Sequence, residues 1–277
     1  MSYNRILTIQ DVSCVGQCSL TVALPIISAC GIETAVLPSA VLSTHTAGFK
    51  GFTFRDLTLD MPKIREHWEK EEIFFDGIYT GYLGSIEQIE IVKDIAKSRL
   101  KDGAPLIVDP AMADNGNLYS IFDMSYVEKM KELCTVADYL VPNITEACFL
   151  TGEEYKEEYD RVYIDTLLQK LCDLGAKTIV LTGVSYKQGR TGVVVYKDGK
   201  YDYYEHQKIA KGCHGTGDIY ASAFVGALIN GKTAIESAKI AADYTLNCII
   251  ETQKQDNHWY GACFEPVLYT LIQAIKQ

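Results

Sequence analysis

The chain has 277 residues, and 48% of them are hydrophobic against 22% charged, so its composition is that of a globular protein with a large core and excludes a disordered chain. Lysine and arginine number 26 and aspartate and glutamate 36, which gives a net charge of −10. A field of this sign repels polyanions, so no nucleic acid partner is expected. An anionic small molecule can still bind where backbone N–H groups, a helix N-terminus or a metal ion reverses the local field.

No stretch reaches the roughly 18 uncharged apolar residues of a membrane span, and residues 1–10 contain no basic segment followed by an apolar one. We therefore expect a cytoplasmic protein with no membrane partner. The nine cysteines include no C-x-x-C pair. Reduced thiols in the core are expected rather than a zinc site or a disulfide framework.

Short apolar runs bounded by turn residues alternate along the chain with stretches of helical period. This pattern is typical of an α/β fold with a mainly parallel sheet and helices on both faces. Strands are predicted at residues 5–10, 34–38, 74–80, 106–109, 139–141 and 178–182. Neither an internal repeat nor a linker interrupts the pattern, so residues 1–277 are expected to form one domain.

Two segments depart from the alternation. Residues 191–205 predict a hairpin that turns at Asp198-Gly199, and residues 40–58, rich in glycine, threonine and aromatic side chains, predict a flap. Helix starts are predicted at Asp60, which Met61 and Pro62 follow, and at Ser85, whose helix is expected to end at Gly103. The C-terminal part from residue 217 reads as helical, with a break at residue 231 and a third helix from near residue 263.

Polar residues occur just after five of the predicted strands, where ligands of open parallel sheets bind. They are Gln10-Asp11, Thr80-Gly81-Tyr82, Asp109-Pro110 with Asp114, Asn143 with Glu146, and Thr182-Gly183. Because the carboxyl ends of parallel strands share one edge, we expect these groups along a single rim.

The most informative segment is Gly215-Thr216-Gly217-Asp218, which leads into a helix of small residues. Glycines on both sides of Thr216 allow a tight turn that directs consecutive N–H groups toward one anion, and the helix adds its positive end. Asp218 beside this cradle could accept a hydroxyl proton. The same residues also suit an ordinary turn and helix start with a capping acid. P-loop, zinc-protease and nucleophile-elbow motifs are absent, and Tyr220 stands where a dinucleotide fingerprint needs glycine or alanine.

This motif, together with Asp109-Pro110 and Val141-Pro142-Asn143 with Glu146, resembles the ribokinase-like superfamily of small-molecule kinases. The segments at residues 6–10, 42–46 (Leu-Ser-Thr-His-Thr) and 80–82, with Gly16, are similar to pyridoxal kinases, which phosphorylate the 5′-hydroxymethyl group of vitamin B6 forms. The resemblance implies a three-layer α/β sandwich with a small β flap over the site, and a homodimer. It also implies ATP and Mg²⁺, with a monovalent cation in some relatives.

Residue roles follow from the resemblance alone. It implies that Asp218 is the catalytic base and that the amides of Gly215, Thr216 and Gly217 form the anion hole. It further implies that Asp109 and Glu146 organise Mg²⁺, that Asp114, Tyr119, Asn143, Glu146, Thr182 and Gly183 surround ATP, and that Asp11, Thr46 and Tyr82 line the pocket of the pyridine ring.

Three positions depart from the usual pattern. Asp11 replaces the serine of most pyridoxal kinases, and its carboxylate could pair with the pyridinium nitrogen or, more selectively, with the cationic aminomethyl group of pyridoxamine. The second pairing predicts a preference for pyridoxamine. Val141 stands where some relatives have a threonine that helps to hold a monovalent cation, so potassium dependence stays open. His214 is typical of hydroxymethylpyrimidine kinases, although that branch often has cysteine at the position of Asp218. A hydroxymethylpyrimidine kinase and a non-catalytic vitamin B6 or nucleotide sensor therefore remain alternatives.

Overall fold

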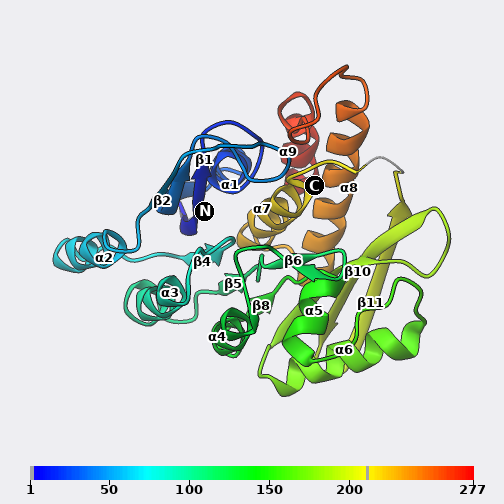
Figure 1. Cartoon of the computed structure of the whole chain (residues 1–277), viewed down its shortest axis with the longest axis horizontal. Helices are drawn as coiled ribbons and strands as arrows, with labels where there is room; N and C mark the ends of the chain where they lie inside the picture. Colours follow the sequence, from blue (N-terminus) through cyan, green and yellow to red (C-terminus); the bar gives the residue numbers. More distant parts are fainter. Residues whose placement is uncertain (1–2, 210–211) are drawn as a thin grey trace.

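The computed structural model describes residues 3–209 and 212–277, and its centre is a twisted sheet with helices on both faces (Figure 1). The strands of this sheet lie in the order β11-β10-β9-β8-β5-β4-β1-β2-β3. Their bounds are β1 Arg5–Ser13, β2 Glu33–Leu42, β3 Phe54–Asp56, β4 Gly77–Thr80, β5 Leu106–Val108, β8 Tyr139–Leu140, β9 Thr178–Val184, β10 Arg190–Lys197 and β11 Lys200–Gln207. The strands from β9 to β2 are parallel, whereas β3, at one edge, and the β10–β11 hairpin, at the other, add antiparallel pairs.

The helices form two layers that bury opposite faces of the sheet. One layer contains α1 Leu20–Ala29, α7 Thr216–Ile229, α8 Ala234–Thr252 and α9 Leu268–Lys276, which the short 3₁₀ helix η1 Glu265–Val267 precedes; the other contains α2 Met61–Lys70, α3 Ile86–Arg99, α4 Met124–Cys134, α5 Ile144–Thr151 and α6 Arg161–Asp173. Side chains alternate along β1, so that Ile6 joins the core under the first layer while Leu7 and Ile9 join the core under the second. The predicted three-layer sandwich is confirmed.

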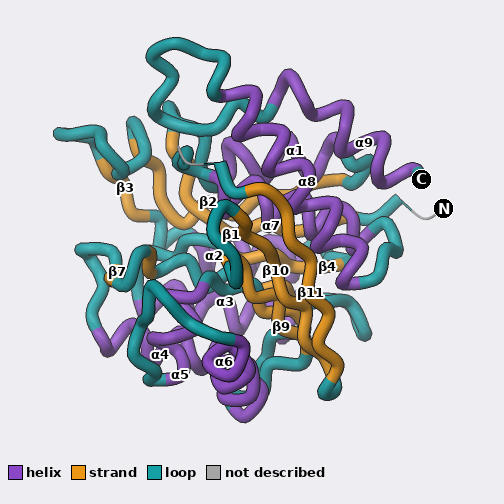
Figure 2. The backbone as a smooth tube through the Cα atoms, turned by 90° about the vertical axis from the view of Figure 1, so that its right-hand side faces the viewer, coloured by secondary structure: helices purple, strands orange, loops and turns teal. Residues whose placement is uncertain are grey.

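The hairpin and the flap are both present at the edges of the sheet. Lys197 pairs with Lys200 across the predicted Asp198-Gly199 turn, and Figure 2 shows β9, β10 and β11 side by side. In the predicted flap, β2 continues to Leu42 and pairs with β3. The flap is therefore an extension of the sheet edge with a loop over residues 43–53. A second small sheet, β6 Ala113–Asp114 with β7 Asn117–Leu118, was not predicted.

Several predicted boundaries were wrong. The strand predicted from residue 74 begins at Gly77, because Asp76 leaves the ladder and accepts hydrogen bonds from the Arg5 amide (2.8 Å) and from Lys101 Nζ (2.7 Å). Asp60 precedes α2 but its side chain makes no capping bond, since its backbone is already helical. Ser85 does cap α3, with its hydroxyl accepting from the Gln88 amide at 3.2 Å. That helix ends at residue 99 rather than 103, and the last one begins at residue 268 rather than near 263.

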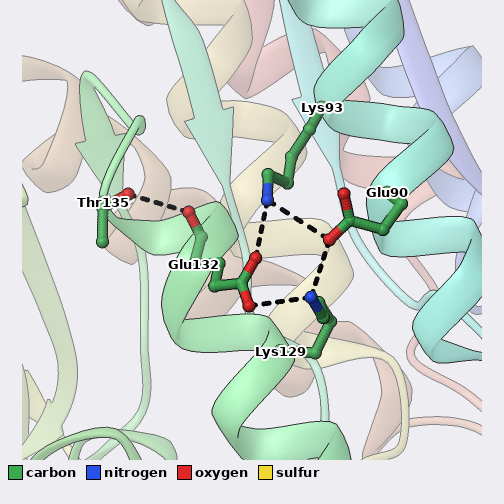
Figure 3. A network of polar contacts seen from close by, with 5 residues as sticks. All are labelled: Glu90, Lys93, Lys129, Glu132 and Thr135. Atoms are coloured by element: carbon green, nitrogen blue, oxygen red, sulfur yellow. Dashed lines mark hydrogen bonds and ion pairs between the residues drawn. The ribbon is translucent and has the colours of Figure 1, made fainter.

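A surface network joins α3 and α4 on the outer side of their layer (Figure 3). Lys93 and Lys129 each contact both Glu90 and Glu132, at distances from 2.7 to 3.2 Å. Among the described residues, no helix is long and apolar enough to cross a membrane. Cys30, Cys134, Cys148, Cys248 and Cys263 are buried in the layers, as expected of core thiols, whereas Cys14 is exposed and Cys18, Cys172 and Cys213 are half-buried.

Candidate active site

Helix α7 begins at the rim of the sheet without a capping side chain. Its N-cap residue is Gly215, and no side chain accepts a hydrogen bond from the first turn. The first intrahelical bond shown at this end runs from the Ile219 amide to the Gly215 carbonyl, at 3.0 Å. The amides of Thr216, Gly217 and Asp218 therefore have no partner within the helix. Free amides and a positive helix end together make an anion cradle.

The two glycines of the motif differ in conformation. Gly215 has φ +77, and a Cβ built on it would lie 1.8 Å from the carbonyl oxygen of Gln17, so this position requires glycine. Gly217, by contrast, is helical, and a Cβ there would meet no atom within 4 Å. The prediction that both glycines shape the turn is therefore wrong for Gly217. The backbone at residue 217 instead leaves open space beside the cradle.

Asp218 lies in the first turn of α7 and is partly buried. Burial raises the pKa of its carboxyl to about 7; the charge of Asp11 adds to this, and the backbone N–H of Ser19, which faces the carboxylate, opposes it. A carboxyl with a pKa near neutrality can accept a proton and release it again at physiological pH. Asp218 thus lies beside the cradle and has a raised affinity for protons.

Asp109 follows β5 directly and lies close to two other acidic groups. Burial raises the pKa of its carboxyl well above the usual range, and the charges of Glu146 and Asp218 raise it further. Among the described residues, none donates a hydrogen bond to this carboxylate; its amide donates to the Thr80 carbonyl at 2.9 Å. Like charges gathered in this way favour binding of a cation between them.

Asn143 and Glu146 form a capping box at the start of α5. The Glu146 amide donates to Asn143 Oδ1 and the Asn143 amide donates to Glu146 Oε2, both at 2.9 Å. The second carboxylate oxygen of Glu146 accepts from the Met112 amide at 3.2 Å, and burial raises the pKa of Glu146 to about 7. Asn143 Nδ2 donates to the Ala113 carbonyl at 2.9 Å. Both side chains thus hydrogen-bond to backbone groups, as they would at an ordinary helix start.

No group of three or more His, Cys, Asp or Glu side chains within the described ranges could hold a metal ion alone. Magnesium is usually held by one or two carboxylates, with waters and substrate phosphates completing its shell. Asp109 and Glu146 fit this pattern. Because the Glu146 oxygens already accept backbone hydrogen bonds, Asp109 is the better direct ligand and Glu146 suits a contact through water.

Asp114 and Tyr119 lie around the small β6–β7 hairpin. Asp114 is exposed, and its carboxylate accepts two hydrogen bonds from Asn115, each 2.9 Å long. Tyr119 is 41% exposed, yet its hydroxyl end is desolvated, which raises its pKa, and the charges of Glu146 and Asp109 add to that effect. The hydroxyl of Tyr119 is thus close enough to the acidic groups to feel their charges.

Thr182 and Gly183 were expected after a strand but lie inside β9. The pairing with β10 passes from Thr182 to Val184, so that Gly183 forms a β-bulge. The Thr182 amide donates to the Pro142 carbonyl at 2.9 Å, and Asn143 forms an isolated bridge with Thr182. This places the bulge next to the start of α5, on the rim.

Asp11 also lies within its strand, β1, where the pairing with β2 is irregular. Its side chain is buried, and Oδ2 accepts a hydrogen bond from Ser13 Oγ at 2.8 Å. Burial raises the pKa of Asp11, while the Ser19 and Ser13 hydroxyls lower it. Tyr82 is near enough for the charge of Asp11 to add to burial in raising its pKa. Thr46 is exposed on the flap, and no contact brings its side chain to Asp11 or Tyr82.

Sequence reasoning missed two residues at this rim. Ser19 has φ +52, which is rare for a residue other than glycine, and it precedes α1 without capping it. Nothing in the local sequence signals this conformation. His45 was visible within the flap motif but carried no assigned role; it is buried between three segments.

A hollow of about 1280 Å³ lies at the opposite end of the strands, among residues such as Pro105, Lys177 and Gly199 that stand at the start of strands or in turns. None of the rim residues described in this section lines it. We assign the site by the chemistry of the rim rather than by cavity size, because ligands of parallel sheets bind at the carboxyl ends.

A parallel α/β sandwich with an open helix N-terminus, a neighbouring carboxylate of raised pKa and two further acidic groups, one just after β5 and one in the first turn of α5, defines a ribokinase-like kinase of small molecules. The chain matches the phosphomethylpyrimidine kinase family over residues 27–263. It belongs to this family.

Individual relatives carry two different names. A structure titled a putative phosphomethylpyrimidine kinase from Bacteroides thetaiotaomicron, in a form with pyridoxal, is 36% identical, with a TM-score of 0.91 over 98% of this chain and 96% of that one. A pyridoxal kinase from Lactobacillus plantarum is 30% identical, with a TM-score of 0.90 over 98% of both chains. A hydroxymethylpyrimidine/phosphomethylpyrimidine kinase of Aquifex aeolicus is 28% identical over 186 residues, 66% of this chain and 71% of that protein.

Proposed function

We propose that the protein is an ATP-dependent kinase that phosphorylates the 5′-hydroxymethyl group of vitamin B6 vitamers. The observation that carries the proposal is the juxtaposition of Asp218, whose pKa is raised to about 7, with the uncapped N-terminus of α7. The similarity to a structure in a form with pyridoxal and to a pyridoxal kinase supports the choice of substrate class.

In the proposed reaction Asp218 takes the proton of the substrate alcohol as its oxygen attacks the γ-phosphorus of ATP. The new oxygen–phosphorus bond forms while the bond from the γ-phosphorus to the bridging oxygen breaks, and ADP leaves with the electron pair. The amides of Gly215, Thr216 and Gly217 stabilise the charge on the transferred group. The proton stays on Asp218 until product release.

The acidic pair and its neighbours are proposed to receive the nucleotide. When bound, Mg²⁺ would neutralise phosphate charge. Asp109 would hold it directly and Glu146 through water, and both carboxyls have the raised pKa expected of groups that await a cation. Asp114, Tyr119, Asn143, Thr182 and Gly183 would surround the rest of ATP. Val141 is buried and apolar, so its side chain supplies no oxygen to a monovalent cation.

Within this function we propose that Asp11 favours pyridoxamine. Its carboxylate lies beside Tyr82 at the rim and accepts a hydrogen bond from the Ser13 hydroxyl; burial raises the pKa of Asp11, and the Ser19 and Ser13 hydroxyls oppose that shift. An ionised carboxylate attracts the aminomethyl cation of pyridoxamine, which pyridoxal lacks. Thr46 on the flap would also contact the ring.

A hydroxymethylpyrimidine kinase is the second candidate. The family match and the Aquifex aeolicus relative favour it, as does His214 before the cradle. Both candidates need the same phosphoryl transfer, and they differ only in the ring that carries the alcohol. Asp218 itself favours a vitamin B6 kinase, because hydroxymethylpyrimidine kinases often have cysteine at this position.

A coupled assay of ADP release decides between them. The wild-type protein is supplied with ATP, Mg²⁺ and, separately, pyridoxal, pyridoxamine, pyridoxine or hydroxymethylpyrimidine. The highest kcat/KM is expected with a B6 vitamer. A higher value with hydroxymethylpyrimidine would transfer the assignment to the second candidate, and no ADP with any alcohol would favour a non-catalytic sensor. Light scattering in the same buffer tests the proposed homodimer.

A further inference from the structure

His45 in the flap has both ring nitrogens engaged by the backbone. The Ala47 amide donates to Nδ1 at 3.1 Å, and Nε2 lies 2.6 Å from the carbonyl oxygen of Tyr260. Because Nδ1 accepts a hydrogen bond, the ring proton must be on Nε2, which donates it to Tyr260. The ring is therefore held as one neutral tautomer, and it links the flap to a segment 215 residues away in the chain.

The same ring is packed against the loop between β1 and α1. A Cβ on Gly16, which has φ +109, would lie 2.1 Å from His45 Cδ2, so the ring occupies the space that any side chain at residue 16 would need. The His45 amide also donates to the Val15 carbonyl, at 3.2 Å. His45 is thus fixed to the loop that leads from Asp11 to Ser19.

Aromatic contacts reinforce the link to the C-terminal segment. The ring of Phe49 lies 5.0 Å from that of His45 and 4.7 Å from that of Trp259, centroid to centroid. On another side the His214 ring, which directly precedes the cradle, lies 5.6 Å from His45. The flap, the β1–α1 loop, the segment around Tyr260 and the start of the cradle therefore meet at one buried side chain.

We propose that His45 is a positioning residue that holds the flap closed on the site, and with it the neighbouring Thr46. The expected effect of His45 on substrate affinity rests on the proposed function, whereas the packing of the flap against the neighbouring segments does not. His45 is not placed to touch reacting atoms. It acts through the segments that it joins.

The charge state of the ring supports this role. Burial lowers the pKa of His45, as does the nearby His214, while the Tyr260 carbonyl and Asp11 raise it. His258 also faces this region, with its ring 4.3 Å from that of Tyr260. A second proton on Nδ1 would point at the Ala47 N–H group, so two donors would face each other and the flap would lose a bond.

The test uses Trp259 as a reporter, in a Trp68→Phe background where it is the only tryptophan of the chain. His45→Leu removes both hydrogen bonds. His45→Gln keeps a side-chain N–H that can reach the Tyr260 carbonyl and cannot titrate. Ser43→Ala is the matched control, since the Ser43 hydroxyl accepts only from Thr53 within the flap (2.8 Å).

We expect His45→Leu to change the Trp259 emission, to speed tryptic cleavage after the exposed Lys50 and Arg55, and to raise the KM for the B6 substrate about tenfold at an unchanged KM for ATP. His45→Gln restores emission and KM, and Ser43→Ala leaves both as in the background protein. Emission of the background protein should change on acidification below pH 6.5, and that of His45→Gln should not.

Unchanged emission, cleavage and KM in His45→Leu would overturn the proposal, as would a His45→Gln protein that behaves like His45→Leu. Emission and cleavage need no turnover. If no alcohol is phosphorylated, the proposed function fails while these two readouts still decide the role of His45.

Discussion

Replacing Asp218 by asparagine should lower the rate of catalysis while raising the stability of the fold. Asparagine keeps the size of the side chain but cannot accept the proton of the attacking alcohol. Loss of a general base costs about 10²- to 10⁴-fold in kcat, which corresponds to about 3 to 5 kcal/mol in the barrier. The KM for ATP should change little, because the backbone amides of the cradle remain.

The same change should make the protein more stable. The pKa of Asp218 is raised to about 7 from 3.8 by burial, so folding becomes less favourable as pH rises through this range and the group ionises. The full cost at pH 8 is at most about 4 kcal/mol, since each pKa unit corresponds to 1.36 kcal/mol. The side chain is partly exposed, so we expect roughly 1 kcal/mol and a rise in Tm of roughly 2 to 4 °C.

Coupled ADP release measures kcat and kcat/KM, and calorimetry at pH 8 and pH 5 measures Tm. For the wild-type protein kcat/KM should fall as pH drops below about 7, because Asp218 then carries a proton, and Asp218→Asn should lack this limb. The gain in Tm should be larger at pH 8 than at pH 5. A near-wild-type kcat in Asp218→Asn would refute its role as base, and a lower Tm at pH 8 would refute the electrostatic reasoning.

Three further predictions use single substitutions. Gly215→Ala should lower Tm markedly, because the new Cβ would lie 1.8 Å from the carbonyl oxygen of Gln17. Gly217→Ala should leave Tm the same or slightly higher, because no atom lies within 4 Å of a Cβ at that position. Equal changes in Tm for the two variants in calorimetry would contradict the geometry of the cradle. Asp11→Ser should lower the ratio of kcat/KM for pyridoxamine over pyridoxal about tenfold, and an unchanged ratio would remove Asp11 as a vitamer selector. Glu132→Gln should leave kcat unchanged and lower Tm slightly at pH 7. Because ion pairs lower the pKa of Glu132 to about 2 from 4.5, the difference in Tm from the wild-type protein should shrink as pH falls from 4.5 to 2, and also in high salt. A difference in Tm that persists at pH 2 would exclude the ion pairs as its cause.

Local features of the fold could be predicted from the sequence because neighbouring residues determine them. The Asp198-Gly199 turn, the Ser85 cap and the start of α7 beside Gly215 all depend on contacts within a few residues. The alternation of apolar strands and helical segments predicted the layered architecture for the same reason. Where neighbours from elsewhere in the chain intervene, prediction failed: Asp76 leaves its strand to meet the Arg5 amide.

The residues at the rim likewise combine features set by the local sequence with features set by distant parts of the chain. The sequence by itself determined which side chains are chemically able to act: Asp218 beside a glycine turn, Asp109 after a strand, and the Asn143–Glu146 box. Only the tertiary structure decided their proton affinities and neighbours, because burial and the approach of distant carboxylates raise the pKa values of Asp218 and Asp109. His45 meets Tyr260 across 215 residues, and no local pattern records such a contact, since it depends on how the flap and the C-terminal segment pack against one edge of the sheet.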